Sequence, residues 1–161
     1  GRKDINCIDV KIEQILIVNR IKKIINFIYM TTNELSKIVF EAGLKIHRKI
    51  GPGLLESAYE ECLAYELKKK GLKVQKQLSL PIVYEEVNVS DAYRIDLFVN
   101  EKLIIELKTV KELNELHFAQ LLTYLRLTNC QLGLLINFNV PLFKDGVRRV
   151  TNGYIENSKH Q

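Results

Sequence analysis

The sequence has few of the residues that define specialised classes of protein. Its 161 residues include three cysteines, three prolines, one methionine and no tryptophan. The cysteines, Cys7, Cys62 and Cys130, lie far apart and form neither a CxxC pair nor a Cys/His spacing typical of zinc sites. We interpret Cys62 and Cys130 as small buried residues in a reducing compartment rather than as redox sites.

The sequence also lacks an apolar run that could cross a bilayer. Its most apolar stretch, residues 12–30, is interrupted by Asn19, Arg20, Lys22, Lys23 and Asn26. These charges lie within the stretch rather than before it, which differs from a secretory signal. The sequence therefore predicts a cytoplasmic protein with no membrane partner.

Charge of one sign is scarce in most of the chain. The net charge is +5, but residues 1–29 hold six Lys/Arg and three Asp/Glu, whereas residues 30–161 hold 18 and 16. The larger part is thus only +2, and net charge alone does not establish nucleic-acid binding. With 47% hydrophobic and 27% charged residues, the composition is that of a globular protein with a single core.

The first 29 residues differ from the rest. After Met30, the only methionine, the segment Thr31-Thr32-Asn33 offers helix-capping residues ahead of an apolar helical period. One hypothesis is that residues 1–29 are a leader that does not belong to the domain; the alternative is an extra amphipathic helix packed on it. We predict a domain over residues 30–152 and a C-terminal tail over 153–161.

Hydrophobic periodicity predicts an α/β protein, a mixed sheet flanked by helices. Helices are expected over 31–50, 54–70 and 114–128. Strands are expected over 73–80, 82–87, 93–99, 103–110, 132–138 and 147–150. The predicted order is ααβββ(β)αββ.

Three charged residues interrupt the apolar strands of a predicted hairpin. Charged groups in a buried strand are costly unless they are paired or hold a cation. Facing residues in an antiparallel hairpin have numbers of constant sum, and burying Leu97 with Ile105 in one apolar layer makes that sum even. Asp96 and Glu106 then share the opposite face with Lys108, and the even sum requires a three-residue loop or a bulge rather than a two-residue turn.

Two carboxylates and a lysine on one face suit divalent-metal chemistry. Carboxylate oxygens hold Mg²⁺ or Mn²⁺, the ion activates a water, and Lys108 would stabilise charge on a phosphate. The alternative is a surface salt bridge between Glu106 and Lys108.

Two helices carry further candidates. Glu56 begins an inward stripe with Tyr59, although it could simply favour the helix N-terminus from solvent. His117, Gln120 and Tyr124 form a polar line on the third helix, suited to contacting a phosphate backbone or positioning the lysine, or else an ordinary solvated face.

These motifs together resemble a known family. The segment Gly53-x-x-Glu56-x-x-Tyr59 is similar to the signature of the GxxExxY proteins, assigned to the PD-(D/E)XK nuclease superfamily. The likeness covers about residues 33–152 and includes the segments Tyr93-Arg94-Ile95-Asp96, Ile105-Glu106-Leu107-Lys108, Gln120 to Leu125, Gly133 to Phe138 and Lys144 to Val150.

The resemblance implies a restriction-endonuclease-like αβββαβ core and a Mg²⁺- or Mn²⁺-dependent nuclease. It implies that Asp96, Glu106 and Glu56 are metal ligands and that Lys108 is the catalytic lysine. Gln120 and Tyr124 match a helix motif of the superfamily's exonuclease branch. His47 and Arg94 are further substrate-binding candidates, with a capping or surface role as the alternative for His47.

Two functions from different classes remain. The first is a nuclease that cuts nucleic acid, with DNA preferred over RNA, for which a homodimer would supply two sites. The second is a non-catalytic nucleic-acid-binding or protein-interaction module that retains the fold.

Overall fold

The computed structural model describes residues 7–153, which divide into two units. The first unit, residues 1–31, contains one helix, α1 (Cys7–Tyr29). Among the described helices none is long and apolar enough to span a membrane. The predicted tail, 153–161, lies outside the described residues apart from Gly153, and the leader hypothesis for residues 1–29 stays a prediction.

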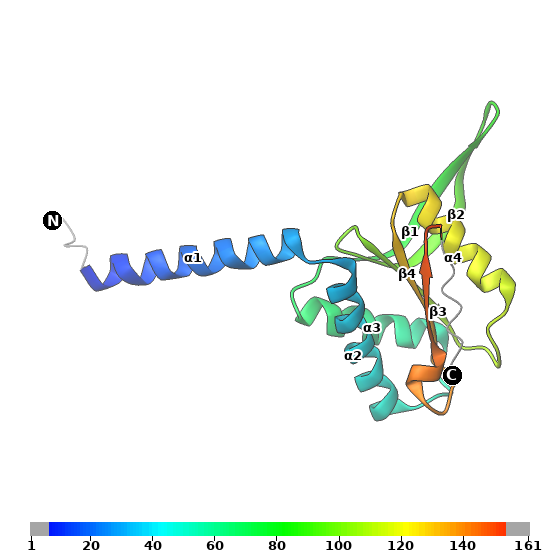
Figure 1. Cartoon of the computed structure of the whole chain (residues 1–161), viewed down its shortest axis with the longest axis horizontal. Helices are drawn as coiled ribbons and strands as arrows, with labels where there is room; N and C mark the ends of the chain where they lie inside the picture. The colour runs from blue at the N-terminus through cyan, green and yellow to red at the C-terminus, as the bar shows by residue number, and fades with distance from the viewer. Residues whose placement is uncertain (1–6, 154–161) are drawn as a thin grey trace. The chain divides into compact units, whose positions relative to one another are not determined.

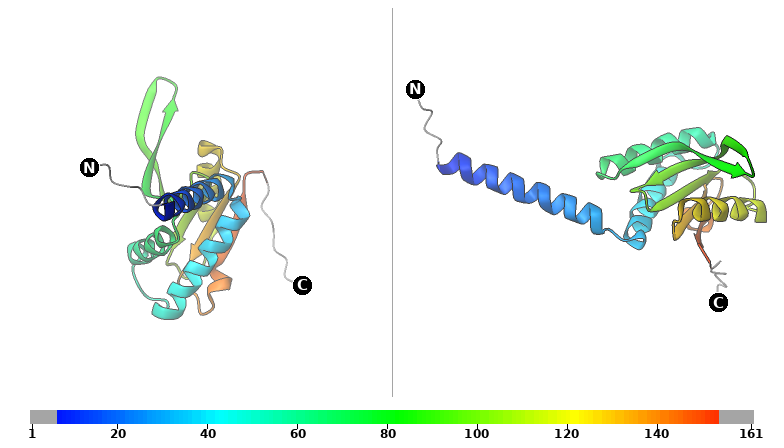
Figure 2. Two further views of the ribbon diagram at one scale, coloured as in Figure 1. Left: turned by 90° about the vertical axis from the view of Figure 1, so that its left-hand side faces the viewer. Right: turned by 90° about the horizontal axis from the view of Figure 1, so that it is seen from above.

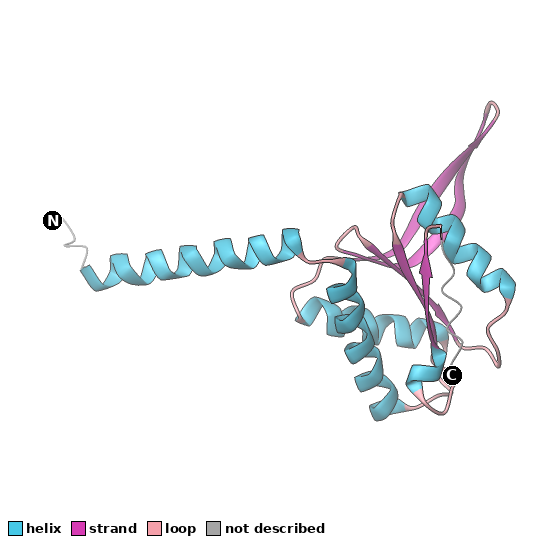
Figure 3. Cartoon of the chain, viewed as in Figure 1, coloured by secondary structure: helices cyan, strands magenta, loops and turns pink. Residues whose placement is uncertain are grey.

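The second unit is the predicted α/β domain (Figures 1 and 3). Its five strands lie in the order β1-β2-β3-β4-β5, all antiparallel neighbours except the parallel pair β3 and β4. The elements are α2 (Thr32–Ile50), α3 (Glu56–Lys69), β1 (Val74–Tyr84), β2 (Val87–Val99), β3 (Leu103–Lys108), α4 (Glu115–Thr128), β4 (Leu132–Asn137), the 3-10 turn η1 (Phe143–Gly146) and β5 (Val147–Thr151). The run from α3 to β4 confirms the expected αβββαβ core.

Helices cover both faces of the sheet. The views agree that α3 and α4 lie on opposite sides of the strands (Figure 2), and α2 packs against α3 and β3. The central strand β3 is consequently buried on both faces, and residues 103–107 are at most 3% exposed. This explains why β3 is a nearly continuous apolar run rather than an alternating one.

The predicted separate strand over 82–87 is wrong. β1 continues through Pro81 to Tyr84, and β2 begins at Val87 after a turn in which Glu85 has φ 51°. Pro81 lacks a backbone N–H, and the pairing register shifts between Leu80 and Ile82. The proline therefore produces an irregularity in an edge strand rather than its end. The ends of β1 and β2 form a two-stranded ribbon (Figure 1).

The predicted register of the β2–β3 hairpin is confirmed. Leu97 pairs with Ile105 and Val99 with Leu103, so the sum is even. A three-residue loop, 100–102, joins the strands; Asn100 and Glu101 have φ of 50° and 55°. The side chain of Asn100 stabilises the loop, because its Oδ1 accepts a hydrogen bond of 2.9 Å from the Lys73 amide.

One part of the predicted apolar layer is wrong. Ile95 belongs to the buried cluster that packs against α4 and includes Phe98 and Ile104. Strict alternation would put Ile95 and Phe98 on opposite faces of β2. The alternation is therefore interrupted around Asp96, where the β2–β3 pairing, which ends at Leu97 and Ile105, has already stopped.

The close packing of α4 on β4 gives a stability prediction. A Cβ at Gly133 would lie 2.7 Å from Cδ1 of the fully buried Leu121. We expect Gly133→Ala to lower the free energy of unfolding by about 1–3 kcal/mol, measured by urea denaturation. In a Leu121→Ala background the loss should shrink, since the clashing atoms are gone; an equal loss in both backgrounds would contradict this contact.

Candidate active site

The first acidic candidate is placed by a glycine-rich turn and one tyrosine. Gly51 and Gly53 have φ of 77° and 110°, which glycine adopts without strain. The Tyr59 hydroxyl donates to the Gly51 carbonyl oxygen (2.6 Å) and accepts from the Leu54 amide (3.2 Å). This fully buried tyrosine therefore fixes the turn relative to α3, whose first residue is Glu56.

The second candidate, Asp96, lies where β2 parts from β3. Its Oδ2 accepts a hydrogen bond of 2.8 Å from the Leu107 amide, beyond the last β2–β3 pair. The side chain of Asp96 thus satisfies a backbone donor that a continued ladder would have used. Burial is the main influence on the Asp96 carboxyl and raises its pKa, while the Leu107 amide and the charge of Lys108 lower it.

The third candidate, Glu106, is only 3% exposed. Its Oε1 accepts a hydrogen bond of 3.0 Å from Lys108 Nζ, and its buried Oε2 has no hydrogen-bond partner within residues 7–153. Burial raises the pKa of Glu106 to about 7, with a further increase from Asp96, and Lys108 opposes both. Glu106 is therefore a buried carboxyl whose negative charge is incompletely compensated.

A chain of hydrogen bonds connects Lys108 to α4. Lys108 Nζ donates to Gln120 Oε1 (3.3 Å), and Gln120 Nε2 donates to the Tyr124 hydroxyl (2.8 Å). The backbone of Arg94 also hydrogen-bonds with Tyr124, while the Arg94 side chain is exposed. The predicted polar line on this helix therefore faces the lysine rather than solvent at Gln120 and Tyr124.

The four predicted catalytic residues interact electrostatically. Burial raises the pKa of Glu56, the charge of Asp96 raises it further, and Lys108 and the Thr109 backbone lower it. Glu56, Asp96 and Glu106 thus surround the amine of Lys108 closely enough to influence one another. Within residues 7–153, however, no three His, Cys, Asp or Glu side chains form a complete metal-binding group.

Two predicted histidines have structural contacts. His117 belongs to a capping box at the start of α4: its backbone N–H donates to Asn114 Oδ1, and its Nδ1 accepts from the Asn114 amide. His47, 8% exposed, lies 2.7 Å from the Val140 carbonyl oxygen through Nε2, and its ring is 5.7 Å from that of Phe143. These contacts tie α2 to the loop before η1, and none of them involves the acidic residues.

Sequence reasoning missed two polar residues beside Asp96. Gln77 Nε2 donates to Glu60 Oε2 (2.6 Å) and to Asp96 Oδ1 (3.3 Å). Glu60 follows Glu56 by four residues on α3, so helical spacing could have placed both on one side. Gln77 had no such signal, because its position depends on the irregular backbone of β1.

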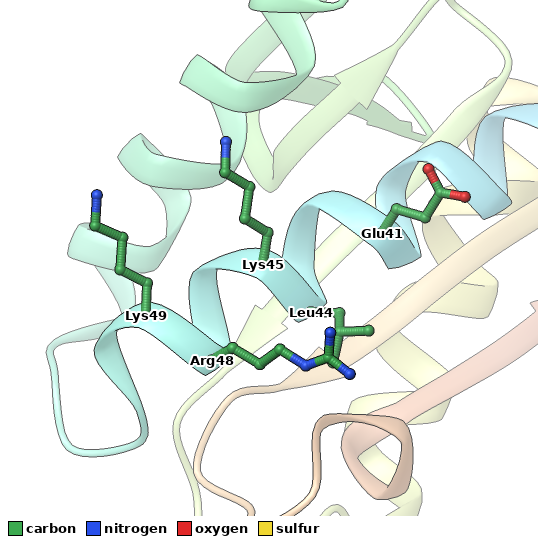
Figure 4. Close-up of a pocket in the computed structure, with 5 residues that line it drawn as sticks. All are labelled: Glu41, Leu44, Lys45, Arg48 and Lys49. Atoms are coloured by element: carbon green, nitrogen blue, oxygen red, sulfur yellow. The ribbon is translucent and has the colours of Figure 1, made fainter.

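A shallow hollow on α2 contains none of the predicted catalytic residues. It is lined by Glu41, Leu44, Lys45, Arg48 and Lys49 (Figure 4). Lys45 forms an ion pair of 2.8 Å with Glu66, and the lining has one carboxylate among three cations. This hollow lacks the paired acids that metal chemistry requires.

The raised pKa of Glu106 predicts a pH-dependent stability difference. A folded-state pKa of about 7 against 4.5 means that the folded protein binds this proton more tightly than the unfolded chain. The contribution is present below pH 4.5 and is lost as the pH rises through about 7. Glu106→Gln should therefore stabilise the protein by up to roughly 3 kcal/mol at pH 8–9.

The measurement is urea denaturation of both proteins between pH 5 and 9 in EDTA. The stability difference between them should shrink toward pH 5, where the wild-type carboxyl is largely protonated. A difference independent of pH would show that Glu106 does not titrate in this range.

Comparison with known proteins agrees with this geometry. Searches of curated proteins and of solved structures found no match. A family model described as the PD-(D/E)XK nuclease superfamily matches residues 33–150, which include every predicted site residue. The mixed five-stranded sheet flanked by helices is consistent with the restriction-endonuclease-like fold. With the family model covering most of its length, this chain belongs to the PD-(D/E)XK nuclease superfamily.

Proposed function

We propose that the protein is a metal-dependent nuclease that hydrolyses phosphodiester bonds, with Glu56, Asp96, Glu106 and Lys108 as its catalytic residues. The observation that carries this proposal is Glu106: a buried carboxyl with one oxygen paired to Lys108 and the other without a partner in the described part of the chain. A buried acid in this condition is costly in a purely structural role.

The acidic residues fit a hard divalent cation. Glu106 Oε2 is an available oxygen donor, and Asp96 and Glu56 have carboxylates whose pKa values are raised in the same site. An added positive charge would relieve the repulsion that Asp96 exerts on the other two. Mg²⁺ or Mn²⁺ bound there supplies Lewis acidity, which lowers the pKa of a coordinated water and neutralises phosphate charge.

Lys108 is held in place for a role in catalysis. Its ammonium group has three hydrogens, of which one points to Glu106 Oε1 and another to Gln120 Oε1. The remaining hydrogen can contact a phosphate oxygen or orient the attacking water. Gln120 and Tyr124, linked by a 2.8 Å hydrogen bond, keep the amine in this position, and the exposed Arg94 is available to bind substrate phosphate.

A non-catalytic binding module is the second candidate. It is favoured by the nearly neutral charge of residues 30–161, with 18 Lys/Arg against 16 Asp/Glu, and by the incomplete metal-binding group within residues 7–153. Such a module would bind nucleic acid or protein without turnover. Catalysis and binding must therefore be measured separately.

Cleavage assays test the catalytic proposal directly. Wild-type protein with Mg²⁺ or Mn²⁺ should cleave labelled nucleic acid, and EDTA should abolish the reaction. DNA substrates, single- and double-stranded, come before RNA. We expect Lys108→Ala to lower kcat by about 10²–10³-fold, because it removes a donor to the reacting phosphate. Gel-resolved product formation provides the rate.

Lys68→Ala is the matched control, since it removes an exposed lysine near the far end of α3. It should retain wild-type activity. Equal cleavage by Lys108→Ala and wild type would sink the assignment of this lysine. Sedimentation of the same protein with a two-site DNA would show whether a homodimer accompanies cleavage.

Metal binding gives an independent prediction. Mn²⁺ should raise the Tm of the wild type, because the ion binds only the folded protein. The double variant Asp96→Asn, Glu106→Gln should lose most of this increase while it remains folded, as judged by circular dichroism. Glu61→Gln, which neutralises an exposed acid on α3, should behave as the wild type. Identical Mn²⁺-induced shifts in all three proteins would remove the metal site from the proposal.

A further inference from the structure

Gln77 has an unusual backbone conformation inside a strand. Its φ is 51°, a value that residues with a side chain rarely adopt. The other described non-glycine residues with positive φ lie in turns or at a helix end, whereas Gln77 lies in the middle of β1. On either side of it the pairing with β2 is regular, with Lys76 opposite Leu97 and Leu78 opposite Ile95. Such local strain persists where the surrounding structure compensates for it.

The strained position brings one amide to two acids. Gln77 Nε2 lies 2.6 Å from Glu60 Oε2 and 3.3 Å from Asp96 Oδ1. An amide nitrogen carries two hydrogens, so it can donate to both acceptors at once. Because the amide is neutral, it holds Asp96 without forming an ion pair that would compete with a cation for the carboxylate.

Glu60 anchors this amide from α3. It is 8% exposed, and its described hydrogen bond is to Gln77. Asp96 is consequently held at both oxygens, by the Leu107 amide on Oδ2 (2.8 Å) and by Gln77 on Oδ1. Each carboxylate oxygen has a second lone pair, which stays available to a ligand.

We propose that Gln77 and Glu60 are positioning residues that fix the orientation of the Asp96 carboxylate for cation binding. The metal part of this proposal rests on the proposed function, whereas the positioning part concerns the protein alone. The irregular backbone of β1 is then the structural feature that lets Gln77 reach between α3 and β2.

The first test measures positioning without metal. Hydrogen exchange of the Leu107 amide, followed by NMR in EDTA, reports the bond that this amide donates to Asp96. Gln77→Ala should accelerate that exchange at least tenfold. Gln75→Ala removes a glutamine two residues earlier on the same strand and should leave it unchanged. Unchanged exchange in Gln77→Ala would overturn the proposal.

The second test measures Mn²⁺ affinity by calorimetry. Gln77→Ala and Glu60→Ala should each raise the Kd about tenfold or more, as loss of a group that orients a ligand does. Glu60→Gln retains an oxygen that accepts from Gln77 and should recover most of the affinity. Equal weakening by both Glu60 variants would show that the bond to Gln77 is not what matters.

Gln77→Gly separates side chain from backbone. Glycine adopts positive φ freely, so this variant should unfold at a higher Tm than Gln77→Ala. Both should nevertheless lose Mn²⁺ affinity equally, and kcat on DNA should fall while KM changes little. Full affinity in Gln77→Gly would overturn the role of the amide.

The two proposals can fail separately. If the wild type neither binds Mn²⁺ nor cleaves nucleic acid, yet Gln77→Ala releases the Leu107 amide, the positioning role stands and the nuclease proposal falls. If Asp96→Asn abolishes Mn²⁺ binding while Gln77→Ala changes neither exchange nor affinity, the positioning role falls and the metal site stands.

Discussion

The site depends on the separation of β2 from β3. Regular pairing ends at Leu97 and Ile105, and the next amide of β3 that would need a partner, that of Leu107, donates to the Asp96 side chain. A backbone donor in a buried strand must be satisfied, and here a carboxylate satisfies it. This exchange places an acid next to Glu106 and Lys108 at the point where the strands diverge. The same hydrogen bond therefore completes the strand and builds the site.

Electrostatic compensation in this site is incomplete. Lys108 is the cation that lowers the pKa of Glu56, Asp96 and Glu106, and it opposes burial and mutual repulsion in all three. One lysine cannot neutralise three carboxylates, so the site retains an excess of negative charge. In a protein of this superfamily, the residual charge is what a divalent cation would balance. Stability and function thus oppose each other at Glu106, as is common at catalytic sites.

The glycine-rich turn and its tyrosine serve the same end from the other side of the sheet. Tyr59 holds the turn through two hydrogen bonds, and its ring stacks on Phe138 at 4.3 Å, just beyond β4. The start of α3 is thereby tied to the sheet through a rigid aromatic contact. Glu56 and Glu60 lie one helical turn apart on this anchored helix, which explains how one helix reaches Lys108 and Gln77.

The sequence by itself determined the helices, most strands and the pairing of the hairpin, because these follow from local periodicity and from the need to bury Leu97 with Ile105. It also singled out the acids and the lysine, since charges within buried strands are costly without a purpose. Only the tertiary structure decided that His47 bonds with the Val140 carbonyl, that Ile95 packs toward α4 and that Gln77 bridges Glu60 and Asp96. These features depend on a change of facing along β2 and on one strained residue of β1, which arise from contacts between distant segments and leave no periodic signal in the chain.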